Sequence, residues 1–156
     1  MAAQKLQPSD ALEVIPSDNA DIPFVNKSAE GTNTSATTNK LVDSGATFNN
    51  GTVNVGDIVY NITDATAATV TDIDSATTLS LNADIFAAGS KVYIIYARNS
   101  NQGCVLYVGG AGDLKVTTAS RQTVLFKAVP VGTFIPINVV KVFDTDTTAT
   151  FLLALW

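Results

Sequence analysis

The sequence predicts an all-β protein: a β-sandwich or small β-barrel with a second, barrel-like β module inserted into it. Short runs in which apolar and polar residues alternate recur about every 8–12 residues, the spacing typical of all-β domains. Clusters of Asn, Asp, Gly, Ser and Pro, which favour turns, lie between these runs. Helical periodicity is almost absent, whereas threonine and the β-branched residues that suit strands are abundant.

The alternating runs give the expected elements in order. Ten runs predict strands: 12–15, 57–62, 68–73, 78–81, 91–97, 104–108, 113–118, 123–127, 135–143 and 149–155. One helical turn is expected at 83–87, with Asn82 as its N-cap, because an amide oxygen can accept bonds from the free N–H groups of a first turn. Residues 118–122 and 129–133 predict hairpin connections, the latter because it contains Pro130 and Gly132.

Changes in composition predict a discontinuous domain. Residues 28–52 are small and polar and predict a linker, whose only sizeable apolar residues are Leu41, Val42 and Phe48. The segment 12–25 is too short to bury its apolar side chains alone, so we expect it to pair with the unit 104–156. The expected division is therefore 1–27 plus 101–156 as one β domain, with 28–100 as an inserted β module.

The balance of charge and hydropathy points to self-association. Of the 156 residues, 46% are hydrophobic and only 15% are charged, and the mean hydropathy is +0.24. A subunit that assembles can bury such surplus apolar surface against its neighbours. The net charge of −5, without any basic run, argues against a nucleic-acid partner. No apolar stretch approaches the roughly 20 residues that span a bilayer, so no membrane partner is expected either.

The residues that usually carry chemistry are scarce, so we expect no enzyme, no catalytic or cofactor-binding residues and no cofactor. Histidine is absent, which removes the Ser-His-Asp and Cys-His triads and the usual zinc ligands. The single cysteine, Cys104, lies in an apolar run and is expected to be a buried thiol.

Two pairs of aspartates could supply oxygen ligands to calcium. Asp72 and Asp74 flank one residue, as do Asp144 and Asp146, so each pair would share a face of a strand. Neither pair is followed by the glycine and the closing glutamate of a calcium loop. Aspartate also favours turns, so we expect turn residues and no metal site, with calcium binding as the alternative.

The stretch YVGGAGDLKV, residues 107–116, raises the question of a phosphate site. In a dinucleotide fingerprint the third glycine would stand at Lys115, and in a P-loop a lysine would replace Asp113. An alternating strand follows the glycines, so no helix N-terminus is available to bind a phosphate. The stretch therefore predicts a tight hairpin turn in which a glycine takes a positive φ.

Two parts of the chain resemble a known family. The segment ALEVIPSDNADIPF and the segment LYVGGAGDLKVTTASRQTVLFKAVPVGTFIPINVVKVFDTDTTATFLLALW resemble the spike-base proteins of tailed phages and gene transfer agents. The matching residues are Pro16, Ser17, Asp18, Asp21, Ile22, Pro23, Tyr107, Val108, Gly109, Gly112, Asp113, Leu114, Val116, Val129, Pro130, Gly132, Thr133, Pro136, Thr147, Thr148, Ala149 and Thr150. Arg121 stands where the family often has a turn glycine. The insertion resembles a small β module of phage structural proteins.

The resemblance implies a structural virion protein on the capsid surface, made in the host cytoplasm. It implies ring-like homo-oligomers, pentamers with trimers as the alternative, that dock on the major capsid protein or another virion protein and serve as the base of a head spike or fibre. We expect Phe24, Phe134 and Trp156 to form subunit contacts, since large aromatic residues anchor interfaces; burial in the core is the alternative.

A receptor- or carbohydrate-binding module of a fibre or tail is the second interpretation. It would use Tyr60, Tyr93 and Tyr96 as rings that stack on sugars, unless these are core partners on neighbouring strands.

Overall fold

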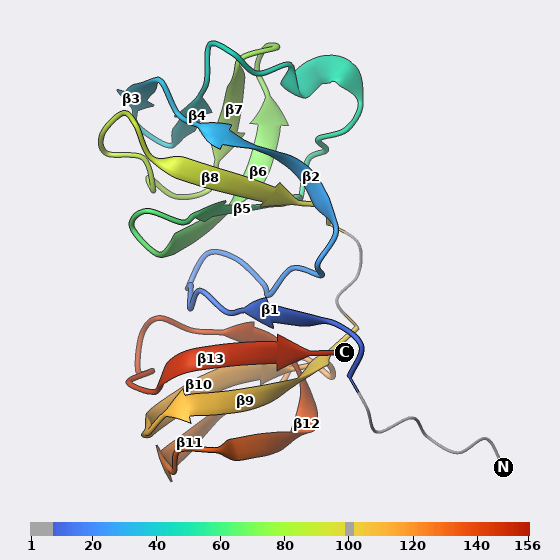
Figure 1. The fold of residues 1–156 in the computed structure, drawn as a ribbon, viewed down its shortest axis with the longest axis vertical. Coiled ribbons are helices and arrows are strands. Elements are labelled where there is room, and N and C mark those ends of the chain that lie inside the picture. Colours follow the sequence, from blue (N-terminus) through green and yellow to red (C-terminus); the bar gives the residue numbers. More distant parts are fainter. Residues whose placement is uncertain (1–7, 99–101) are drawn as a thin grey trace, which may run out of the picture. The chain divides into compact units, whose positions relative to one another are not determined.

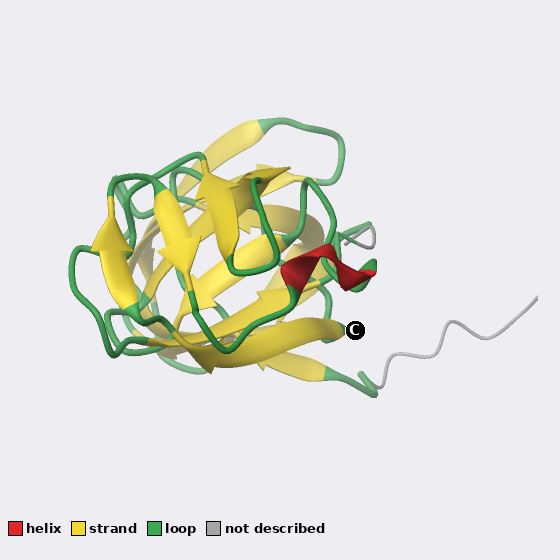
Figure 2. Cartoon of the chain, turned by 90° about the horizontal axis from the view of Figure 1, so that it is seen from above, coloured by secondary structure: helices red, strands yellow, loops and turns green. Residues whose placement is uncertain are grey.

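The computed structural model describes residues 8–98 and 102–156 and confirms the all-β class. Strands and loops make up almost all of the described chain, and helix is confined to one short 3-10 segment, η1 (Phe48–Asn50) (Figure 2). The described chain divides into two compact units, each with one antiparallel sheet (Figure 1). Unit 1 comprises residues 8–14 and 102–156, and unit 2 comprises residues 15–98.

Unit 1 contains six strands around an apolar interior. They are β1 (Ala11–Glu13), β9 (Cys104–Gly110), β10 (Gly112–Thr118), β11 (Thr123–Val129), β12 (Thr133–Val142) and β13 (Thr150–Leu155). Their order in the sheet is β1-β13-β9-β12-β10-β11. Alternate residues of the central strands point inward, and Leu106, Val108, Leu114, Val116 and Ala154 are fully buried.

The glycine stretch is not a hairpin turn, which corrects the prediction. β9 and β10 do not pair with each other, because β12 lies between them, and Gly109, Gly110 and Gly112 do not have positive φ. The chain instead continues from β9 into β10 through Ala111. The glycines are needed there because the segment before and within β13 passes very close: a Cβ on Gly109 would lie 2.7 Å from the carbonyl oxygen of Phe151.

The other two predicted connections have different outcomes. The hairpin at 118–122 is confirmed, since β10 pairs with β11 and the Arg121 N–H donates to the Thr118 carbonyl at 2.8 Å. At 129–133 the turn is present, with Gly132 at φ +82°. It is not a hairpin, however, because it carries the chain from β11 across β10 to β12.

Unit 2 contains seven strands that curl into a barrel-like sheet. They are β2 (Lys27–Thr32), β3 (Ser35–Thr37), β4 (Lys40–Val42), β5 (Ile58–Asn61), β6 (Thr66–Ile73), β7 (Thr78–Leu81) and β8 (Val92–Tyr96), in the order β2-β8-β5-β6-β7-β4-β3. The two ends of this order, β2 and β3, are separated in the chain only by Asn33 and Thr34. The sheet therefore curves until its ends meet around one core, which includes Leu41, Phe48, Phe86, Tyr93 and Ile95.

Two predictions within unit 2 are wrong. Residues 28–52 are not a linker: they form β2, β3, β4 and η1, and bury Leu41 and Phe48 in the core. Residues 83–87 form no helical turn. The Asn82 side chain instead accepts the Thr69 N–H at 2.8 Å and donates to the Asn19 carbonyl at 2.7 Å, so it joins two segments of unit 2 rather than capping a helix.

The boundary between the units lies earlier in the chain than expected. Residues 15–27, expected to belong with the C-terminal strands, group with unit 2. The Ser17 hydroxyl donates to the Ala67 carbonyl at 2.8 Å, and the Thr69 hydroxyl donates to the Asn19 carbonyl at 3.0 Å. Of residues 8–27, only the short strand β1 pairs with a strand of unit 1, namely β13.

Candidate interaction surface

The three most exposed large apolar side chains of the described residues all belong to unit 1. Phe151 on β13 is 75% exposed, Val131 in the turn before β12 is 63% exposed, and Phe134 on β12 is 57% exposed. Scattered apolar residues are common on protein surfaces, but exposed apolar residues that gather on one face mark interaction sites.

Phe134 and Phe151 lie on β12 and β13, the two strands that flank β9 in the sheet. Tyr107 on β9 lies opposite both Phe134 on β12 and Leu153 on β13, which gives one row across three strands. The Tyr107 and Phe134 rings have centroids 5.3 Å apart and an angle of 57° between their planes. Phe151 precedes Leu153 by two residues and therefore lies in the next row, over Gly109, so the row and Phe151 form one apolar surface.

Local backbone geometry holds two of these side chains outward. Phe151 has a φ of +52°, a conformation that bulky residues rarely adopt, and its neighbour across the ladder is Gly109, which leaves room for its backbone. Val131 stands at the tip of a turn that Gly132 closes with φ +82°, and the Thr133 hydroxyl donates to the Pro130 carbonyl at 2.8 Å. We call Tyr107, Phe134 and Phe151 the aromatic patch.

The three residues expected at subunit contacts are found in different environments. Phe134 lies in the aromatic patch. Phe24 is half-buried in unit 2, and Trp156 is half-buried in unit 1, where its backbone N–H donates to the Asp10 carbonyl at 3.0 Å. The structure does not bring the three together in one unit. Sequence reasoning missed Phe151, because residues 151–155 are all apolar and no alternation shows which of them face outward.

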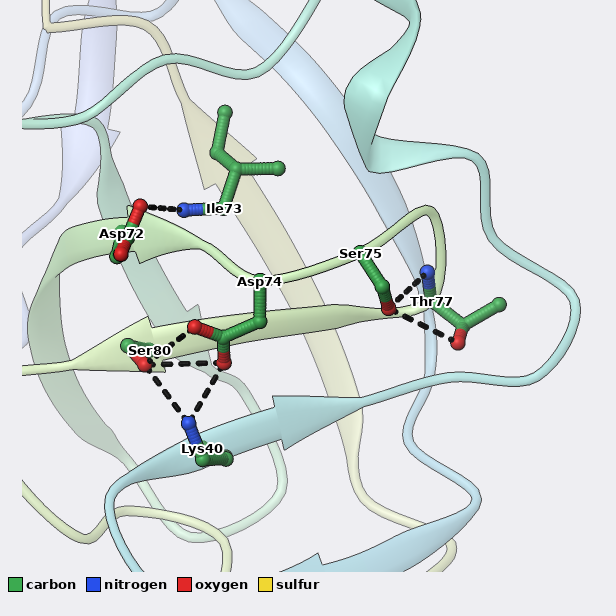
Figure 3. Close-up of polar contacts among 7 residues, drawn as sticks. All are labelled: Lys40, Asp72, Ile73, Asp74, Ser75, Thr77 and Ser80. Atoms are coloured by element: carbon green, nitrogen blue, oxygen red, sulfur yellow. Dashed lines mark hydrogen bonds and ion pairs between the residues drawn. The ribbon is translucent and has the colours of Figure 1, made fainter.

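The carboxylates of Asp72 and Asp74 do not converge on one point (Figure 3). The Asp72 carboxylate accepts the Ile73 N–H at 2.8 Å. The Asp74 carboxylate accepts bonds from the Lys40 ammonium at 2.6 Å and from the Ser80 hydroxyl at 3.0 Å. The bond from Lys40 is the main cause that lowers the pKa of the Asp74 carboxyl. Asp74 thus fastens the turn between β6 and β7 as expected, whereas Asp72 lies within β6 and is not a turn residue.

The second aspartate pair also lies in a turn. Asp146 has a φ of +66° and its carboxylate pairs with the Lys115 ammonium at 2.8 Å. The Asp144 carbonyl accepts the Thr147 N–H at 3.4 Å. Within residues 8–98 and 102–156, no group of three or more His, Cys, Asp or Glu side chains could hold a metal ion.

Asp113, which follows the glycines, fastens β10 to β11. Its carboxylate accepts the Lys127 ammonium at 2.7 Å and the Ala128 N–H at 2.9 Å. These bonds, that from Lys127 first, lower the pKa of the Asp113 carboxyl. Cys104 is buried as expected, with its thiol 3.3 Å from the Val139 carbonyl.

The three tyrosines weighed as sugar-stacking rings are buried. Tyr60, Tyr93 and Tyr96 are 2%, 1% and 5% exposed. Tyr60 on β5 and Tyr96 on the neighbouring strand β8 make an edge-to-face contact with centroids 5.4 Å apart. They are core partners on neighbouring strands, and none presents a free face to a ligand.

A hollow of about 300 Å³ in unit 2 is lined by polar groups that include Glu30, Asp43, Thr47 and Asn50. Among these residues Asp43 is buried, and its carboxylate accepts the Tyr93 hydroxyl at 2.7 Å and the Gly45 N–H at 2.9 Å. Burial is the main cause that raises the pKa of the Tyr93 hydroxyl, and the nearby Asp43 carboxylate raises it further. The side chain of Asp43 thus ties β8 to the loop after β4.

Comparison with protein-family models, with curated proteins and with solved structures found no match. Among the described residues, none belongs to a helix with the length and apolar composition that crossing a membrane requires.

Proposed function

We propose that this chain is a structural protein of a tailed-phage virion that self-assembles and docks on the capsid as the base of a head spike or fibre. The observation that carries the proposal is the aromatic patch. Its members Phe134 and Phe151 are more than half exposed on one small unit, and burying such rings against a partner is strongly favourable.

The position of the patch agrees with the family resemblance. Most of the residues that resemble spike-base proteins, including the 107–116 stretch and residues 129–136, belong to unit 1, which also carries the patch. The strained Phe151 backbone and the Gly109 opposite it show that the chain holds an aromatic ring outward at a cost to its own stability. A binding role for this face accounts for that cost.

Co-sedimentation with capsids tests the proposal. The capsids come from the phage that encodes this chain and are prepared without this protein. We expect the wild-type chain to pellet with them and the double variant Phe134→Ser, Phe151→Ser to remain in the supernatant. Val55→Ser is the matched control, because Val55 is 50% exposed but lies in unit 2. A wild-type chain that stays in solution, or a double variant that still pellets, would contradict the proposal.

A glycan-binding module has less support. The three clustered tyrosines are buried, and the hollow beside Asp43 offers hydrogen-bonding groups without an exposed ring on which a sugar could stack.

A further inference from the structure

The two outer strands of the unit 1 sheet, β1 and β11, lie at opposite ends of the strand order and carry opposite charge (Figure 1). Residues 8–14, around β1, contain Asp10 and Glu13 and no basic residue. Residues 119–132, around β11, contain Arg121 and Lys127 and no acidic residue. One sheet therefore has an acidic edge and a basic edge.

The outer side of β11 has unpaired backbone groups. In an antiparallel ladder, residues alternately direct their N–H and C=O groups toward the partner strand and away from it. The Thr118 N–H donates to the Gln122 carbonyl at 2.9 Å, and Val116 lies opposite Val124. Thr123 and Leu125, which lie between these paired residues, therefore direct their backbone groups away from β10, on a side where no other described strand lies.

The same alternation holds for β1. Asp10 and Trp156 exchange backbone bonds of 3.3 Å and 3.0 Å, and the Val14 N–H donates to the Leu152 carbonyl at 2.9 Å. Ala11 and Glu13, between these pairs, therefore direct their backbone groups away from β13. Both side chains are exposed, and no other described strand pairs with this edge.

The β11 edge is also apolar. Val124 is 37% exposed and Leu125 is 38% exposed, so both faces of the strand are partly open to solvent. A lysine on an edge strand usually discourages pairing with another chain. The Lys127 ammonium is instead bound to Asp113, 2.7 Å away on the neighbouring strand β10, and is thus drawn toward its own sheet.

We propose that β11 of one copy pairs with β1 of a second copy, so that unit 1 sheets join edge to edge and head to tail. The sheet has six strands and each is antiparallel to its neighbours, so β1 and β11 run in opposite directions. When copies repeat in the same orientation, β11 of one copy therefore lies antiparallel to β1 of the next. A register that sets Leu125 opposite Glu13 places Glu13 of one copy against the basic edge of the other, which contains Arg121 and Lys127. Pairing β11 with a second β11 would instead bring two basic edges together.

This inference supplies the contact for the self-assembly in the proposed function and rests on that part of it. Its test is the mass in solution of the full chain, measured by analytical ultracentrifugation over a range of concentrations. We expect the wild-type chain to form an oligomer and Glu13→Lys to weaken the association about tenfold or more, since a lysine then faces the basic edge. Glu30→Lys, the same charge change at an exposed site in unit 2, should leave the association unchanged.

Charge exchange between copies distinguishes the head-to-tail contact from a symmetric one. Glu13→Lys and Lys127→Glu should each lose association alone and regain it when combined in one chain. An equimolar mixture of the two single variants should regain association as alternating oligomers, because a basic edge meets an acidic edge at every junction between unlike variants. Leu125→Pro should also give monomers, since it removes an outward N–H and leaves the β10 ladder intact.

The outcomes separate the two proposals. A wild-type chain that is monomeric at every concentration overturns the inference. A dimer that is lost in Leu125→Pro but kept in Glu13→Lys also overturns it, because β11 would then pair with something other than β1. An oligomer with the expected charge behaviour that does not pellet with capsids supports the inference and contradicts the proposed function.

Discussion

Replacing Gly112 by alanine tests whether the glycines of the 107–116 stretch allow a close crossing of two backbones. A Cβ at Gly112 would lie 2.5 Å from the Thr148 carbonyl carbon and 2.7 Å from the Thr148 hydroxyl, and would also meet the backbone nitrogen of Ala149. Carbon atoms in good contact are about 3.5–4.0 Å apart, so the two segments would have to separate by about 1 Å. Most of the atoms in the way belong to the backbone and cannot rotate aside.

The cost follows from what holds this crossing together. The Asp113 carbonyl accepts the Thr148 N–H at 2.8 Å and the Ala149 N–H at 3.0 Å. Overpacking costs about 1–3 kcal/mol, and loss of one of these bonds adds about 1 kcal/mol. We therefore expect Gly112→Ala to lower the free energy of unfolding of unit 1 by about 2–4 kcal/mol.

Urea unfolding monitored by tryptophan fluorescence measures this loss. Trp156 is the single tryptophan of the chain and belongs to unit 1, so its emission reports on that unit. Gly132→Ala is the control, because Gly132 has a φ of +82° but open space around it, and only the conformational cost of about 1 kcal/mol is expected. A loss below about 0.5 kcal/mol at Gly112, or a larger loss at Gly132, would refute the reasoning.

Three further substitutions test other parts of the structure. Leu41→Ala should lower the free energy of unfolding of unit 2 by about 2–5 kcal/mol, measured by near-UV circular dichroism, whereas a residue in a linker would tolerate the change. Arg121→Gly should stabilise unit 1 by about 0.5–1 kcal/mol, because Arg121 has a φ of +65°; a lower urea midpoint would count against this. The raised pKa of Tyr93 means that its hydroxyl ionises near pH 10.0 in the unfolded chain but stays protonated at that pH in the folded chain. The stability that Tyr93 contributes is therefore fully present below that pH and falls as the pH rises above it. Tyr93→Phe should flatten this decline in the free energy of unfolding. An unchanged slope of that free energy against pH would contradict the role of Tyr93.

Alternation of apolar and polar residues located the strands that bury one face. The strand at 78–81 was predicted with its observed bounds, because Leu79 and Leu81 enter the core and polar residues flank the run. Strands β2 to β4 were missed for the opposite reason. All three residues of β3 are exposed, and Leu41 alone in β4 is buried, so no hydrophobic period marks these strands. Their position depends on backbone bonds to β8 and β7, which lie far along the chain.

The glycine stretch shows a second limit of local sequence reasoning. Spacing and Asp113 exclude a phosphate loop, but they do not distinguish a turn from a crossing. That distinction depends on residues 148–151, which are remote in the sequence. The candidate surface was predictable in part: Phe134 was expected as a contact residue, whereas the outward position of Phe151 depends on a positive φ that no residue type indicates.

The insertion of unit 2 into unit 1 has a consequence for folding kinetics. β1 lies near residue 12 and its partner β13 near residue 153, so their pairing has a very high contact order. Unit 2, in contrast, is continuous in sequence, and its folding brings the flanking segments together: Lys27 pairs with Tyr96, and the Ala97 N–H donates to the Asn26 carbonyl at 2.8 Å. If folded unit 2 shortens the effective loop between β1 and β13 tenfold, the entropic free-energy cost of closing that loop falls by about 2 kcal/mol. Unit 2 can therefore act as a folding nucleus for its host, and substitutions that slow its folding should delay the return of the Trp156 signal.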